Sequence, residues 1–211
     1  RRFAFRQPAT MRSQPKPSTP AEPRSIDWLD ADEVERVRRA LARRTDYPDE
    51  RGPIELVQTH ISSVFLTPSF VFKCKRPLDV GFADFRALAD RERFCHAEVE
   101  LNRRLAAGVY LAVLPLCAAG SGYRLGGAGP PVDYCVVMQR LPAVDMLDQR
   151  LRQGRVAPPA MDAVARLLVD FNRRAAGGPR LARFGGLATV GGNWEENFRQ
   201  TEPFLGEVMA R

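Results

Sequence analysis

Residues 70–76, Phe-Val-Phe-Lys-Cys-Lys-Arg, are the segment that most restricts how this chain can fold. Its aromatic and β-branched residues predict a strand that ends before Pro77, because proline cannot donate a hydrogen bond to a sheet. Side chains alternate between the two faces of a strand, so Lys73 and Lys75 share one face with Val71. Two lysines on one face of an otherwise apolar strand require either solvent or a negatively charged partner on that side.

A long helix, predicted over about residues 86–106, supplies a candidate partner. An apolar stripe is predicted along it, made of Phe94, Leu101 and Leu105. Glu98 lies within that stripe, and a carboxylate that faces a core needs a partner. We therefore predict an ion pair in which Lys73 Nζ lies within roughly 4 Å of a Glu98 carboxylate oxygen. An ordinary buried salt bridge would produce the same pattern. Lys75 would either meet an anionic group or, as we expect, be solvated at the strand end.

The order of the predicted elements indicates an α+β chain in three parts. Residues 1–25 are a basic, proline-rich tail that we expect to be disordered. Residues 26–141 combine a helix within residues 30–44, the long helix and an antiparallel sheet. Residues 142–211 are predicted to be helical. Besides residues 70–76, the strands of the sheet are predicted in residues 54–67 (two strands with a turn), 109–120 and 133–142.

The positive charge of the chain is concentrated in the tail. The formal net charge is +7, and residues 1–24 hold six basic side chains and one acidic one. The rest of the chain is nearly balanced, which makes nucleic acid an unlikely partner and leaves a basic nucleic-acid-binding module as the weakest of the alternatives. The apolar runs are too short to cross a bilayer, so we expect a cytoplasmic protein with no membrane partner.

The cysteines indicate neither a disulfide framework nor a metal site. There are four, with no C-x-x-C pair: Cys74, Cys95, Cys117 and Cys135. All lie in apolar surroundings, which favours buried free thiols in a reducing compartment. Cys95 precedes His96, but no second pair of closely spaced ligands follows, so no metal ligands are predicted.

Four separated segments resemble the bacterial aminoglycoside-phosphotransferase-like proteins. They are IELVQTHISSVFLT, FVFKCKRPLDVGFADF, RFCHAEVELNRRLAAGVYLAVLPL and VDYCVVMQRLP. The resemblance extends over about residues 54–205 and is strongest over residues 54–142. It implies a protein-kinase-like fold, with an antiparallel nucleotide-binding N-lobe followed by the start of a helical C-lobe. It also implies ATP and Mg²⁺ as cofactors, a small-molecule phosphoryl acceptor, and a possible fused P-loop ATPase domain.

The resemblance also implies roles for individual residues. Lys73 would hold the ATP phosphates and Glu98 would orient Lys73. The other implied nucleotide contacts are Ser62 and Ser63 in a phosphate-covering turn over residues 60–63, Val71 in the adenine pocket, and Met138, Gln139 and Leu141 in a hinge over residues 138–141. A plain polar hairpin turn explains the two serines equally well, because no Gly-rich signature is present there.

The chain departs from the family in its last segment. Kinase-like phosphotransferases need a catalytic-loop Asp and a metal-binding Asp. Residues 177–211 contain neither the His-Gly-Asp loop of the family nor its later acidic motif. We therefore predict the N-terminal part of an ATP-dependent small-molecule phosphotransferase, inactive as this fragment, with the Mg²⁺ ligands outside it. The alternative is a non-catalytic nucleotide-binding or regulatory module.

Overall fold

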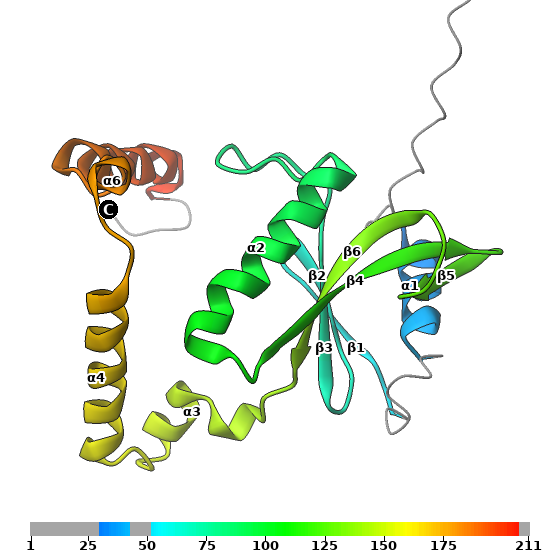
Figure 1. Ribbon diagram of the computed structural model, residues 1–211, viewed down its shortest axis with the longest axis horizontal. Helices are drawn as coiled ribbons and strands as arrows, with labels where there is room; N and C mark the ends of the chain where they lie inside the picture. The colour runs from blue at the N-terminus through cyan, green and yellow to red at the C-terminus, as the bar shows by residue number, and fades with distance from the viewer. Residues whose placement is uncertain (1–29, 43–51, 207–211) are drawn as a thin grey trace, which may run out of the picture. The chain divides into compact units, whose positions relative to one another are not determined.

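The computed structural model describes residues 30–42 and 52–206, so the predicted basic tail at 1–25 lies outside the described residues. The chain divides into two compact units, Arg1–Met146 and Leu147–Arg211. In the described residues the first unit combines helices with a sheet, whereas the elements of the second are helical (Figure 1). None of the helices within residues 30–42 and 52–206 is both long enough and apolar enough to span a membrane.

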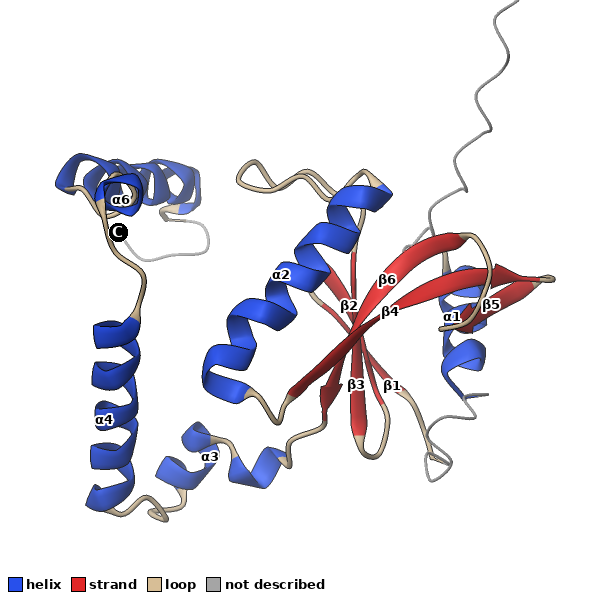
Figure 2. Cartoon of the chain, viewed as in Figure 1, coloured by secondary structure: helices blue, strands red, loops and turns tan. Residues whose placement is uncertain are grey.

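Six strands of the first unit form one antiparallel sheet (Figure 2). They are β1 Glu55–Gln58, β2 Ser62–Leu66, β3 Phe70–Lys75, β4 Tyr110–Ala119, β5 Gly122–Leu125 and β6 Pro131–Gln139. Their spatial order is β1-β2-β3-β6-β4-β5, and each neighbouring pair is antiparallel. The predicted α+β class and antiparallel sheet are confirmed. The short strand β5 was not predicted, because four residues beside several glycines carry little strand pattern.

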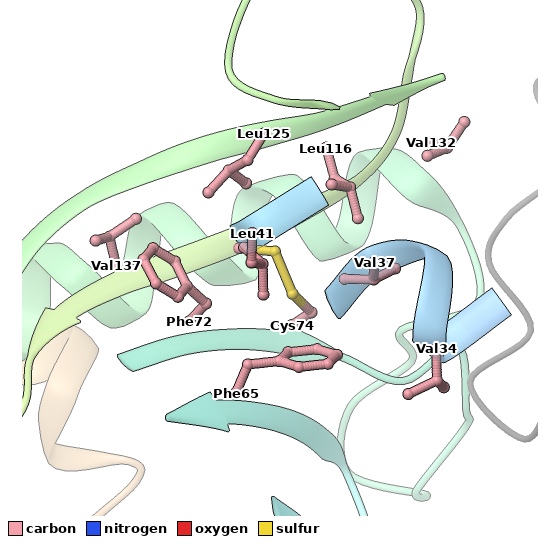
Figure 3. Close-up of a cluster of buried hydrophobic side chains, with 11 residues drawn as sticks. Val34, Val37, Leu41, Phe65, Phe72, Cys74, Leu116, Leu125, Val132 and Val137 are labelled. Atoms are coloured by element: carbon pink, nitrogen blue, oxygen red, sulfur yellow. A yellow bond between two sulfur atoms is a disulfide. The ribbon is translucent and has the colours of Figure 1, made fainter. Parts of the chain in front are cut away.

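Helix α1, Ala31–Ala42, packs against one face of this sheet. Asp30 caps it, because its Oδ1 accepts hydrogen bonds from the N–H groups of Asp32 and Glu33 at 2.8 and 3.3 Å. A buried cluster joins the helix to the sheet (Figure 3), with members Val34, Val37, Leu41, Phe65, Phe72, Cys74, Leu116, Leu125, Val132, Cys135 and Val137. This cluster is the main core of the first unit.

Helix α2, Leu88–Ala106, packs against the other face of the sheet, with α1 and α2 drawn on opposite sides of the strands in Figure 1. Its predicted span is confirmed, but its predicted core-facing stripe is wrong. Leu101 and Leu105 are 56% and 44% exposed. The buried positions of the helix are Arg91, Cys95 and Val99, four residues apart. Apolar residues are scattered around α2, so the helical wheel did not define a single buried face.

The two central strands are joined by a disulfide between Cys74 of β3 and Cys135 of β6. The prediction of four free thiols is therefore wrong for this pair, whereas Cys95 and Cys117 are free and buried as predicted. Cys74 and Cys135 are directly opposite each other in the β3–β6 register, with Cα atoms 4.4 Å apart. That register depends on the sheet order, which the spacing of the cysteines along the chain does not contain.

The second unit contains helices with largely exposed surfaces. Their bounds are α3 Leu147–Arg152, α4 Pro158–Arg174, α5 Pro179–Ala182 and α6 Leu187–Thr201, followed by the 3₁₀ turn Glu202–Phe204; a similar turn, Ala143–Asp145, precedes α3. An apolar stripe runs along α4, but its members Val164, Leu167 and Leu168 are 41–47% exposed. None of residues 147–206 is buried.

Candidate functional site

The alternation of β3 brings its two lysines to the face of the sheet that α2 covers. Phe72 and Cys74 point into the core on the α1 side. Lys73 and Lys75 point the other way, where Glu98 of α2 lies between them. Lys73 Nζ is 2.8 Å from Glu98 Oε1, which confirms the predicted ion pair. The strand therefore carries two lysines on one face because a helix places a carboxylate there.

Lys75 is part of the same ion-pair cluster, contrary to the prediction that it is solvated. Its Nζ lies 2.6 Å from Glu98 Oε2, and its side chain is only 7% exposed. The ammonium also lies over the ring of Phe85, 5.4 Å from the centroid. Phe85 belongs to the loop between β3 and α2 and closes over the end of the strand. Solvation was predicted because Lys75 lies at the end of its strand. Nothing in the sequence indicated that the loop between β3 and α2 would place Phe85 over its ammonium group.

Glu98 is held in its charged form by the two lysines. Burial by itself would raise the pKa of Glu98, but hydrogen bonds from Lys73 and Lys75 and their positive charges outweigh that effect and lower the pKa below its usual value of 4.5. Each carboxylate oxygen accepts one of the two short bonds. One carboxylate therefore serves two ammonium groups, and the cluster of Lys73, Lys75 and Glu98 has a net positive charge.

A second buried ion pair anchors the start of α2, and the sequence analysis missed it. Arg91 and Asp133 of β6 are both 0% exposed, with Nε 2.9 Å from Oδ1. Arg91 Nη1 also donates to the carbonyl oxygens of Phe85 and Arg86 at 3.0 and 2.8 Å. An arginine four residues before Cys95, on the face that continues to Val99, was the signal that could have revealed it.

The far end of α2 is also attached to the sheet. Arg103 Nε donates to the carbonyl oxygen of Tyr110, in β4, at 2.7 Å. The helix is thus bonded to β6 near its start, to β3 in its middle and to β4 near its end. The position of Glu98 relative to Lys73 is set by contacts along the whole helix and not by one pair.

The structure places Ser62 and Ser63 in a strand and not in the predicted turn. The turn comprises residues 59–61, and both serines begin β2 with 0% exposure. The Ser62 N–H donates to Thr59 Oγ1, which closes the turn. Among the described residues neither serine Oγ has a hydrogen-bond partner. Ser62 is opposite Lys75 in the β2–β3 register, so its hydroxyl belongs to the same face as the lysines.

The residues predicted to contact adenine lie where β3 meets β6. Val71 is opposite Met138, and both are partly buried. In the segment that follows, the N–H groups of Gln139 and Arg140 already donate to backbone carbonyl groups, at 2.8 Å each. Leu141 comes after the strand and is 46% exposed. The predicted hinge is therefore adjacent to the lysine strand, although much of its backbone is engaged in the sheet.

Cys95, one turn before Glu98, is not a reactive group in this arrangement. Burial raises the pKa of its thiol to about 12, despite the nearby positive charge of Lys75. His96 is exposed. Over residues 30–42 and 52–206, no group of three or more His, Cys, Asp or Glu side chains is arranged to hold a metal ion.

The chain is similar to proteins of two mycobacterial species. Over 157 residues it is 33% identical to the uncharacterized proteins Rv2004c and MT2060 of Mycobacterium tuberculosis and Mb2027c of Mycobacterium bovis. The match covers 74% of this chain but only 30% of each relative, so the chain spans less than a third of their length. No family model matches the chain. No solved structure matches it either. The names of these relatives state no activity.

Proposed function

We propose that the first unit is the nucleotide-binding lobe of a kinase-like, ATP-dependent phosphotransferase that acts on a small molecule. The observation that carries this proposal is the Lys73–Glu98 pair, which links the third strand of an antiparallel sheet to the helix that follows it. In protein kinases a lysine on such a strand contacts the α- and β-phosphates of ATP and is oriented by a glutamate of the next helix. The net positive charge of the cluster favours an anionic ligand.

In this proposal each residue near the cluster has a defined part. Lys73, at 27% exposure, is the more accessible lysine and binds phosphate oxygens. Val71 and Met138 form an apolar wall for adenine. The Leu141 N–H is the best hinge donor to the base, because those of Gln139 and Arg140 already donate within the fold.

The described residues offer a phosphate group a further hydroxyl, that of Ser62, but they offer no ligand set for Mg²⁺. The unpartnered, buried hydroxyl of Ser62 is a polar group that a phosphate oxygen could satisfy after a small movement of the turn at residues 59–61. Mg²⁺, if bound, would supply positive charge that offsets the charge of the phosphate groups. The described residues do not fit a Mg²⁺ site, since they contain no cluster of acidic ligands. The proposal therefore derives no step through the metal.

A calorimetric titration of the full 211-residue chain with ATP tests the proposal. We expect Lys73→Ala to weaken ATP binding by about 10- to 100-fold, the equivalent of one lost charge-assisted hydrogen bond. The matched control is Arg199→Ala, which removes a positive charge from an exposed position of α6 and should change the dissociation constant less than about twofold.

Adenosine, which has no phosphate groups, separates a phosphate contact from a general loss of structure. If Lys73 binds phosphate, Lys73→Ala should leave the weak affinity for adenosine unchanged. A chain that does not bind ATP, or that loses equal affinity for ATP in the Lys73 and Arg199 variants, would exclude the proposed site. Phosphoryl transfer by this chain would contradict the prediction that it is inactive as this fragment.

A further inference from the structure

We propose that Lys75 is a positioning residue that holds Glu98 in place whether or not a ligand is bound, so that Lys73 remains available to a phosphate group. This inference rests on the proposed function, because it assigns the phosphate contact to Lys73. It also makes a claim about the free protein. The ion pair between Lys75 and Glu98, and not the one involving Lys73, keeps the middle of α2 against β3.

The two lysines differ in how much water reaches them. The side chain of Lys75 is 7% exposed and that of Lys73 is 27% exposed. Lys75 also has the shorter bond to Glu98, 2.6 Å against 2.8 Å, and lies over the buried ring of Phe85. An ion pair that is shielded from water is less screened and stronger than an exposed one. Lys75 is therefore the more firmly held partner of the carboxylate.

The separate oxygens of Glu98 make the two roles compatible. Oε2 accepts from Lys75 and Oε1 accepts from Lys73. A phosphate group that binds Lys73 competes only for the bond to Oε1. The bond to Oε2 remains, so the carboxylate keeps its position while Lys73 moves between its two partners. With a single lysine, the arriving phosphate would compete for the only hydrogen bond between Glu98 and β3.

Contacts at both ends of α2 hold the helix on the sheet, so one further contact is sufficient to hold its middle against β3. Near its start, Arg91 is bonded to Asp133. Near its end, Arg103 is bonded to the backbone of Tyr110. Between these points, Glu98 joins the helix to β3 by accepting one hydrogen bond from each lysine. Loss of the shielded bond should loosen the middle of the helix without releasing its ends.

Hydrogen exchange of the ligand-free chain provides the first test. Mass spectrometry of peptides from α2 is compared between the unmodified 211-residue chain, Lys75→Met and the matched control Lys73→Met. Methionine removes the charge and keeps the apolar stem, so neither change opens a large cavity. We expect Lys75→Met to raise the exchange rate in the middle of α2 by about tenfold, as for one lost charge-assisted bond, and Lys73→Met to raise it less than about threefold. Equal effects, or a larger effect of Lys73→Met, would overturn the inference.

The second test asks whether Lys75 acts through Glu98. ATP dissociation constants are measured for both methionine variants, with and without Glu98→Gln, as a double-mutant cycle. We expect Lys75→Met to weaken ATP binding about tenfold when Glu98 is present and to have no further effect in the Glu98→Gln chain. Lys73→Met should weaken binding in both backgrounds. An effect of Lys75→Met that persists undiminished in the Glu98→Gln chain would mean that Lys75 contacts the nucleotide itself, and the positioning role would be wrong.

The two tests separate the failure of this inference from the failure of the proposed function. If the unmodified chain does not bind ATP, the proposed function fails, and the exchange data still decide whether Lys75 holds α2. If Lys75→Met does not fold, Glu98→Gln takes its place and is compared with Lys73→Met, because Glu98→Gln removes the ion pairs to both lysines whereas Lys73→Met removes only one of them. Glu98→Gln should then raise exchange in the middle of α2 by about tenfold, well above the effect of Lys73→Met, and equal exchange in the two variants would overturn the inference.

Discussion

The two units of this chain use the same kinds of residues but bury them to very different extents. In the first unit, ion pairs join residues 25 and 42 positions apart, Lys73–Glu98 and Arg91–Asp133. In the second unit, two ion pairs join residues four or three positions apart, Arg152–Asp148 and Arg199–Glu196. The first unit has a buried core on both faces of its sheet, whereas no residue of 147–206 is buried.

This contrast shows which features of a sequence create a specific site. The helices of the second unit follow from local sequence patterns, so they could be predicted without knowledge of distant contacts. The carboxylate of Glu98 is fixed between two lysines only because a sheet and a helix are held together by contacts distant in sequence. If this view is correct, changes in the first unit should have large effects and matched changes in the second unit small ones.

The largest expected effect comes from the buried pair at the start of α2. Arg91→Ala leaves the carboxylate of Asp133 buried without its main partner and should lower the free energy of unfolding of the first unit by about 3–5 kcal/mol. Arg199→Ala removes the exposed ion pair to Glu196, which lies three residues earlier in α6. It should lower the free energy of unfolding by less than about 0.5 kcal/mol. Urea denaturation followed through assigned amide signals of each unit by NMR measures both.

A double replacement sharpens this prediction. Arg91→Met with Asp133→Leu removes both charges and should recover much of the lost stability, because the cost comes from an unpaired buried charge and not from the absence of an ion pair. If Arg91→Ala and Arg199→Ala destabilise the chain equally, the proposed difference between the two units is wrong.

The second effect in size concerns the bond between Cys74 and Cys135. A chain that is unfolded, reduced and refolded in dithiothreitol should have a first unit less stable by about 2–4 kcal/mol, since the denatured chain is no longer cross-linked. All four cysteines lie before residue 147, so the second unit is an internal control and should denature at an unchanged urea concentration. Free thiols at both positions in the oxidised, folded protein would contradict the disulfide.

The sequence predicted those parts of the site that depend on local pattern. The β3 alternation and the span of α2 each follow from a few neighbouring residues. The Lys73–Glu98 pair was also predicted, although the stripe that led to it was wrong. Glu98 lies three residues after Cys95, which faces the sheet, and this is why the conclusion survived the wrong choice of Leu101 and Leu105.

The features that the sequence did not predict depend on register and on packing between distant segments. The Cys74–Cys135 bond follows from the pairing of β3 with β6. The burial of Lys75 follows from the position of Phe85, and the burial of Ser62 from where β2 begins. For the disulfide and for Lys75 the determining neighbour lies at least ten residues away along the chain, beyond the range of a helical or strand pattern.

The smallest expected effect is a dependence of stability on pH through Glu98. Its pKa in the folded chain is lowered below 4.5 by Lys73 and Lys75, despite its burial. A lowered folded-state pKa means that the unfolded chain binds the proton more readily. The contribution of Glu98 is therefore fully present above pH 4.5 and is lost as the pH falls through the lowered pKa. The first unit should become less stable over that acidic range.

Comparison with Glu98→Gln isolates this contribution from that of other carboxylates. At neutral pH the variant should be the less stable of the two chains, because Lys73 and Lys75 then face each other without a negative charge between them. As the pH falls below 4.5, the unmodified chain loses the same charge by protonation, so the two stability curves should converge. The amide signals of the second unit should show no difference between the two chains at any pH. A stability gap in the first unit that stays constant from neutral to acidic pH would mean that the glutamate contributes through its shape alone, and the electrostatic account of the site would have to be abandoned.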